Sequence, residues 1–244
     1  MSWLSFFNRS PAKQIERLRK KVKEPHGDPA NRINAVQRLL EMGTPEAYLT
    51  VLERFKIYVS PSRQDEEEKE ELLSWIAGAG QDTVAPLTRF LKNERQVYWP
   101  VEVLKRVLSE DELIAKLTEV LRHHWDRPPA SPDPKAQLIR AVGKLRSPEL
   151  DDTVRLFLED DDDDVVLAVL DFLYASNDEE ANRDAVLKCY LDCEDRPRVR
   201  SYILERLAEK GWSVRGHRPK VEETLPEDYK LTRDGVLKRI RMRR

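Results

Sequence analysis

A unit of about thirty residues recurs along the chain. Segments 28–55 and 133–160 both open with Asp-Pro, continue into an apolar-periodic stretch containing Ala-Val, break at Thr-Pro-Glu or Ser-Pro-Glu, and run into a second such stretch. Because apolar residues spaced three and four apart form one face of a helix, each copy predicts two helices joined by a turn. Segments 65–94, 96–121, 160–193 and the chain from 195 onward follow the same order.

The breaks inside these copies give the period. They fall at Gly43, Gly80, Ser109, Ser147, Asn177 and Gly211, which are 37, 29, 38, 30 and 34 residues apart. Repeats of this length are typical of α-helical solenoids, in which each helix pair packs on the next. We therefore expect an all-α fold, a right-handed α-α superhelix of about six helical hairpins.

Polar residues at the expected helix starts support this division. A Ser, Thr, Asp or Asn side chain accepts from an unpaired N–H in the first turn, and proline is tolerated at the first helical position. One further Asp and one further Ser are each followed three positions later by Glu, as in a capping box. The expected caps are Asp28, Thr44, Asp133 and Ser147, and the expected boxes are Asp65 with Glu68 and Ser109 with Glu112.

The composition agrees with a helical, globular chain. Charged residues make up 36% and aromatic residues 7%, a balance that favours amphipathic helices over sheets. Two cysteines do not form a disulfide framework, and the chain contains no apolar run of about 18 residues. We expect a cytoplasmic protein.

We expect one domain over residues 1–244, with an N-terminal capping segment at 1–24 and the repeats at 28–210. A C-terminal cap at 211–244 would contain a β-hairpin and a basic tail. The hairpin is predicted around Asp234-Gly235, because Asp-Gly favours a two-residue turn.

The repeats also resemble a known family. An Asp at the first helix start, Ala-Val within that helix, a small residue at the turn and Pro-Glu-Ala after it resemble the short bacterial HEAT repeats also found in phycobilisome-lyase proteins. The resemblance covers residues 28–210. Segments 2–22, 54–71 and 211–239 are similar to a set of bacterial HEAT-repeat proteins with no known reaction. The resemblance implies a HEAT/armadillo-like fold. The likeness to phycobilisome-lyase proteins also suggests an accessory role in cofactor attachment or enzyme maturation.

The charge is unevenly distributed. Residues 1–24 carry +5, residues 149–194 carry −13 and residues 195–244 carry +7. Most of the acidity surrounds Glu159 and the five aspartates 160–164, where Asp163 or Asp164 is expected to cap a helix. An acidic partner-binding surface is the alternative. A calcium loop is disfavoured, because Val165 and Val166 interrupt the alternating ligands that it needs.

The cysteines and histidines suggest packing rather than a metal site. Cys189 and Cys193 are four residues apart and share one helix stripe, so we expect them in the core; a two-thiolate half-site would need further ligands. His123 and His124 are expected as surface loop residues.

The tryptophans allow one further comparison. Trp75 is expected in the core, whereas Trp99 and Trp125 are free to stack on a ligand. Trp125-Asp126 resembles the Trp and acid pair of HEAT-like DNA glycosylases, but the acidic segment opposes phosphate binding.

We find no phosphate-binding glycine loop, zinc-protease motif or nucleophile elbow, so we expect no enzyme, cofactor or metal.

The leading hypothesis is a protein-binding scaffold that uses the second helices of its repeats. Nucleic-acid binding through the basic ends is the alternative, and the N-terminal helix with Trp3, Phe6 and Phe7 is either a cap or a membrane anchor. The residues expected to contact a protein partner are Arg89, Lys92, Lys116, Arg155, Arg183 and Lys188.

Overall fold

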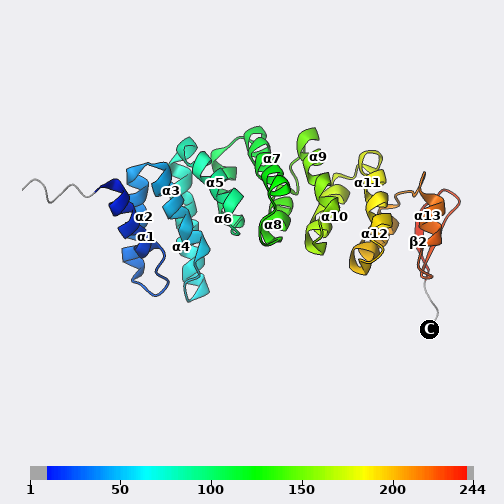
Figure 1. Ribbon diagram of the computed structural model, residues 1–244, viewed down its shortest axis with the longest axis horizontal. Coiled ribbons are helices and arrows are strands. Elements are labelled where there is room, and N and C mark those ends of the chain that lie inside the picture. The colour runs from blue at the N-terminus through cyan, green and yellow to red at the C-terminus, as the bar shows by residue number, and fades with distance from the viewer. Residues whose placement is uncertain (1–9, 241–244) are drawn as a thin grey trace, which may run out of the picture. The chain divides into compact units, whose positions relative to one another are not determined.

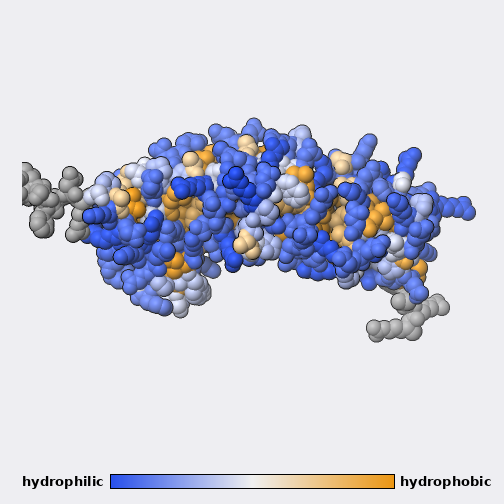
Figure 2. Space-filling view, viewed as in Figure 1, coloured by the Kyte–Doolittle hydropathy of each residue, from blue (hydrophilic) through white to orange (hydrophobic). Residues whose placement is uncertain are grey.

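The structure, a computed structural model, describes residues 10–240. Over this range the chain is predominantly helical and carries one small two-stranded antiparallel sheet (Figure 1), which confirms the expected helical class and the hairpin. Two compact units are present, Met1–Lys116 (unit 1) and Leu117–Arg244 (unit 2), and each is described by itself. On the face shown in Figure 2, hydrophilic residues cover most of the described surface of both units.

The regular elements in the described part of unit 1 are all helical: α1 (Pro11–Val22), α2 (Pro29–Met42), α3 (Pro45–Leu52), η2 (Glu53–Lys56), α4 (Ser62–Gly78), η3 (Gly80–Thr83), α5 (Val84–Asn93), α6 (Tyr98–Val107) and the first part of α7 (Glu110–Asp126). α1 packs on α2 and α3, α3 lies beside α5, and α4 lies beside α6. Leu39, Val51 and Leu87 are fully buried between these helices. First helices therefore pack on first helices, and second helices on second helices.

Unit 2 repeats this arrangement and ends in the sheet. Its elements are the rest of α7, α8 (Asp133–Val142), α9 (Pro148–Leu156), η4 (Phe157–Glu159), α10 (Asp163–Ser176), α11 (Glu179–Asp192), α12 (Pro197–Lys210), α13 (Arg218–Glu223), β1 (Tyr229–Leu231) and β2 (Leu237–Arg239). α10 lies between α8 and α12, α11 contacts α12 and η4, and β2 packs on α12. Leu138, Leu170 and Leu207 are fully buried in this core.

Five of the six predicted breaks lie between two helices, and the sixth, Gly80, begins the short η3 between α4 and α5. Gly43, Asn177 and Gly211 end the first helix of their pairs in the left-handed conformation, with φ of 60°, 55° and 70°. Glycine and asparagine adopt this conformation most readily, which is why they terminate helices. Ser147 instead caps the second helix, because its Oγ accepts from the Leu150 N–H at 3.1 Å.

Several predicted caps are confirmed. Asp28 accepts from the Ala30 N–H at 2.9 Å, and Thr44 accepts from the Ala47 N–H at 3.3 Å. In the capping box, the Ser109 N–H donates to Glu112 at 3.0 Å, and the Glu112 N–H donates to the Ser109 hydroxyl at 3.4 Å. These contacts satisfy donors that helix starts leave unpaired.

Other predicted caps are wrong. α8 begins one residue earlier than expected, with Pro132 at the N-cap, so Asp133 lies inside the first turn. The N-cap of α10 is Asp162 rather than Asp163 or Asp164. Its carboxylate accepts from the N–H groups of Asp164 at 2.9 Å and Val165 at 3.2 Å. At α12 the N-cap residue is Arg196, and its side chain makes no capping hydrogen bond.

The predicted box of Asp65 and Glu68 is also wrong, because α4 begins at Ser62 and places both residues in a buried ionic cluster. Arg32 of α2 pairs with Glu68 at 2.8 Å, and Arg54 of η2 pairs with Asp65 at 2.8 Å and with Glu68 at 3.0 Å. Lys69 pairs with Asp65 at 2.6 Å. The two arginine side chains are each only 2% exposed, so their charges depend on these carboxylates.

Burial and the neighbouring arginines change the pKa of Glu68 in opposite directions. Burial alone would raise the pKa of Glu68, but the hydrogen bonds and positive charges of Arg32 and Arg54 outweigh it and lower the pKa to about 2. The pKa of Asp65 is lowered in the same way, against its burial, by Lys69 and Arg54. Both carboxylates therefore stay ionised at neutral pH, and the cluster joins α2, η2 and α4.

Within each unit, side-chain hydrogen bonds link residues one repeat apart. The separations in sequence are 31 to 33 residues for Arg106 with Ser74, Arg122 with Thr153, Lys210 with Asn177, and Tyr202 with Asp171. The first three distances are 3.2, 3.2 and 3.3 Å. Successive helix pairs of a unit are thus held together by polar contacts as well as by their apolar stripes.

The C-terminal hairpin is confirmed, but its loop is longer than predicted. Leu231 pairs with Leu237, so the loop between the strands runs from 232 to 236. The Gly235 N–H donates to the Thr232 carbonyl at 3.1 Å, with Gly235 at φ 77°. The Val214 N–H donates to the Gly235 carbonyl at 2.8 Å, which ties the loop to the preceding segment.

Candidate protein-docking site

The six residues predicted to contact a partner all lie on second helices of the helix pairs. Arg89 and Lys188 are exposed, and the other four are half-buried. Arg89 and Lys92 lie on α5, Lys116 on α7, Arg155 on α9, and Arg183 and Lys188 on α11. The helix assignment is therefore confirmed, while the binding role stays a prediction.

Two of these residues, Arg155 and Lys188, meet in a cavity of about 420 Å³ in unit 2. The cavity lies between α9 with η4 on one side and α11 with the start of α12 on the other. Its full lining is Arg155, Leu158, Glu159, Asp161, Ala185, Lys188, Cys189, Asp192, Cys193, Asp195 and Arg196. Charges of both signs surround a floor of small and apolar side chains.

The side chains at the rim have weak, exchangeable partners. Lys188 pairs with Glu159 at 3.2 Å, and the two side chains are 65% and 67% exposed. Solvent-exposed pairs of this kind contribute little to stability, so an incoming charged group could replace either partner. Arg155 pairs with Asp152 at 2.5 Å and donates to the Asn182 side chain at 3.2 Å, which fixes its stem between α9 and α11.

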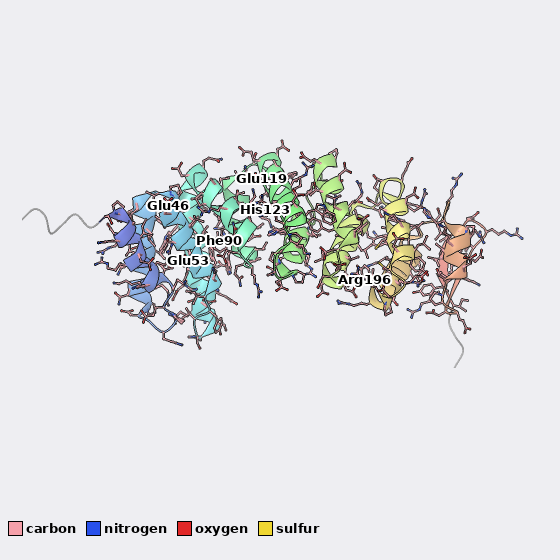
Figure 3. All side chains as sticks on the ribbon, viewed as in Figure 1. Glu46, Glu53, Phe90, Glu119, His123 and Arg196 are labelled. Atoms are coloured by element: carbon pink, nitrogen blue, oxygen red, sulfur yellow. The ribbon has the colours of Figure 1, made fainter. Side chains whose placement is uncertain are left out.

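Arg196 forms the opposite wall of the cavity and is labelled in Figure 3. Its Nε donates to Asp163 at 2.7 Å and its Nη1 to the Asp160 carbonyl at 2.8 Å. Its Nη2 is buried and has no hydrogen-bond partner within the described residues. Burial lowers the pKa of Arg196, but the hydrogen bond and the charge of Asp163 outweigh it and raise the pKa. A permanent cation thus borders the cavity.

Arg196 was not among the predicted residues. It precedes a helix instead of lying on the outer face of one, so helix periodicity does not single it out. The one local sign is Pro197 directly after it, because proline is favoured at the first helical position, but a helix start carries no indication of a cavity.

The floor of the cavity contains the two cysteines, and their predicted burial is confirmed. Their sulfur atoms lie 3.8 Å apart, and each residue is 5% exposed. Burial, followed by the neighbouring Cys193, raises the pKa of the Cys189 thiol, so this thiol is neutral at neutral pH. Within the described residues no group of three or more His, Cys, Asp or Glu side chains is arranged to hold a metal ion.

Asp161 of the aspartate tract lines the same cavity, and the other four members have separate roles. Asp160 is buried and pairs with Lys135 at 2.5 Å. Asp162 caps α10, Asp163 pairs with Arg196, and Asp164 pairs with Arg198 at 2.8 Å. The tract therefore caps a helix, as predicted, and also fastens α8 and α12 to the segment before α10.

Arg183 lies away from this group, in a second cavity of about 740 Å³ whose lining includes Glu180, Asp184 and His217. It pairs with Asp184 at 3.1 Å. Arg89, Lys92 and Lys116 do not line either cavity. The structure brings together only Arg155 and Lys188 of the six predicted residues at this site.

The histidine prediction is wrong. His123 and His124 lie within helix α7, not in a loop, and His124 is 1% exposed. The helix continues to Asp126, because the prolines that end it begin only at Pro128.

The tryptophans pack mainly on other aromatic rings of their own unit. Trp99 stacks on Phe55 with ring centres 5.9 Å apart, and Trp125 meets Phe157 edge-on at 5.4 Å. Trp75 is half-buried rather than part of the core. The rings of Trp99 and Trp125 are thus already in contact with the protein.

Comparison with known proteins yields no match to a family model, to a curated protein or to a solved structure. Within residues 10–240, no helix is both long and apolar enough to cross a lipid bilayer.

Proposed function

We propose that this chain is a HEAT-like repeat protein that serves as a non-enzymatic protein-binding scaffold. Its helix pairs, joined by hydrogen bonds 31 to 33 residues apart, support a right-handed α-α superhelix of successive hairpins. An experimental structure in which successive hairpins wind right-handed would agree with this arrangement, and one in which they do not would contradict it.

The cavity lined by Arg155, Lys188 and Arg196 carries the functional part of the proposal. Its volume of about 420 Å³ suits one or two side chains of a bound peptide. Three cations and four carboxylates surround a small apolar floor, so a segment with an acidic residue next to an apolar one would find matching contacts.

Affinity capture with the full chain tests this assignment. The double variant Arg155→Glu/Lys188→Glu is expected to lose partners that the wild type retains, because it reverses two cations at the rim. The control is Arg198→Glu, an exposed residue of α12 that does not line the cavity. Circular dichroism confirms that the variants are folded. The same partners retained by all three proteins would count against this cavity, and Arg89→Glu/Lys116→Glu would then test the second helices of unit 1.

Nucleic-acid binding is the second candidate, and one observation favours it. Lys230 and Lys238 face each other across the hairpin and are both exposed. Like charges directly opposite destabilise a strand pair, so an anionic ligand would relieve them. Binding to a generic duplex that weakens steeply with salt would support this function, and no binding at low salt would dismiss it.

A further inference from the structure

The outward side of α1 carries a row of cations, Lys13, Arg17, Lys20 and Lys21. Their spacing of four, three and one places them on one side of the helix, and all four are exposed. None of the four forms an ion pair or a side-chain hydrogen bond with another residue of the described chain. We call these four residues the cationic face of α1.

The other sides of α1 are occupied. Ile15, Leu18 and Val22 are buried where the helix packs on α2 and α3. Arg19 and Lys23 hold Glu53 at 3.0 and 3.4 Å. Glu53 directly follows α3, whose first turn contains Glu46, and both glutamates are labelled in Figure 3. The helix therefore cannot bury its apolar stripe in lipid while unit 1 stays folded, and only its cationic face is available to another surface.

The chemistry of this face fits a flat anionic surface. The four residues span nine positions of a helix, which is eight steps or about 12 Å, and point the same way. Each basic residue near an anionic bilayer strengthens binding about fivefold. Nucleic acid is also anionic, but the sequence just before α1 contains Trp3, Leu4, Phe6 and Phe7, which lie outside the described residues. Bulky aromatic residues beside Lys and Arg favour the lipid–water interface, whereas a phosphate backbone gives them no contact.

We propose that the cationic face of α1 docks the protein on a bilayer rich in anionic phospholipid. The attachment is peripheral and electrostatic, and it leaves the helix pairs of unit 1 intact. This goes beyond the scaffold function, because it assigns a location at which a scaffold would gather its partner.

Co-sedimentation with vesicles tests the proposal using the full chain. Wild type is expected to bind vesicles of phosphatidylcholine with phosphatidylserine and not vesicles of phosphatidylcholine alone. The α1 variant replaces Lys13, Arg17, Lys20 and Lys21 with Gln. It should bind the anionic vesicles on the order of several hundredfold more weakly, from four losses of about fivefold each.

The control variant makes the same change in net charge elsewhere. It replaces the exposed residues Arg38, Arg95, Lys220 and Arg233 with Gln. Its vesicle binding should stay within about threefold of wild type, well below the loss expected for the α1 variant. Raising the salt from 0.1 to 1 M should release wild type, since the screening length falls from about 10 to about 3 Å.

Three results would overturn the proposal. They are equal binding of wild type and the α1 variant, a larger loss in the control variant than in the α1 variant, and binding of wild type to duplex DNA but not to the anionic vesicles. Because all four replaced side chains point outward and glutamine suits a helix, the α1 variant should keep the wild-type melting curve. If it does not, the same comparison is made with Lys13→Gln and Lys20→Gln singly, each with an expected loss of about fivefold.

Discussion

The ionic cluster of unit 1 allows a quantitative prediction for Glu68→Gln. The replacement keeps the size of the side chain but removes the carboxylate that faces Arg32 and Arg54. Breaking a buried ion pair by removing one partner typically costs about 3 to 5 kcal/mol, because the remaining charge stays buried. The pKa gives a similar figure. A fall from 4.5 to about 2 corresponds to about 3 kcal/mol of stability at neutral pH.

The pH dependence has a definite sign. The pKa of Glu68 is lower in the folded state than its ordinary value of 4.5, so its contribution is complete well above pH 4.5. The contribution is lost as the pH falls from about 4.5 toward about 2. The difference in unfolding free energy between wild type and Glu68→Gln should therefore shrink over this range.

Guanidinium unfolding of the full chain measures the difference, and hydrogen exchange of the α2 and α4 amides locates it in unit 1. The control is Glu67→Gln, whose partner Arg63 is 89% exposed, and it should change little. A cost for Glu68→Gln no larger than that of the control, or a difference that stays constant from pH 7 to pH 2, would refute the reasoning.

Three further predictions concern unit 2 and are read from denaturant unfolding curves. Asp160→Asn leaves Lys135 buried without its carboxylate and should cost about 3 kcal/mol, while Asp161→Asn, at an exposed site, should change little; equal effects would contradict the burial argument. Asp162→Ala removes the cap of α10 and should cost about 1 kcal/mol, whereas Asp162→Asn should retain most of it. Asn177→Gly should be tolerated at φ 55°, but Asn177→Val should cost about 1 to 2 kcal/mol, and equal stability of the two would show that the left-handed turn is not required.

The helices and their breaks were predictable because their signals are local. Apolar residues three and four apart mark a buried stripe, and Gly43, Asn177 and Gly211 mark helix ends by their tolerance of positive φ. The placement of Arg155 and Lys188 on second helices follows from the same periodicity. Each of these inferences depends on residues within one helical turn of each other.

The wrong capping box and the missed cavity share a non-local cause. Asp65 and Glu68 have the spacing of a capping box, but their partners Arg32 and Arg54 are 11 to 36 residues away. Local spacing cannot distinguish a carboxylate that caps a helix from one that pairs with a distant arginine. The cavity was missed for the same reason, since Arg196 borders it only because α12 packs beside α10 and α11.

The pairing of the aspartate tract affects how the chain responds to polycations. Asp160, Asp163 and Asp164 each face a lysine or arginine of a neighbouring helix pair, so much of their charge is compensated in the native protein. Unfolding separates these partners and presents the whole tract to the solvent. A polyamine or a lysine-rich peptide would consequently bind the denatured chain more tightly than the native one, and by mass action it would act as a mild denaturant.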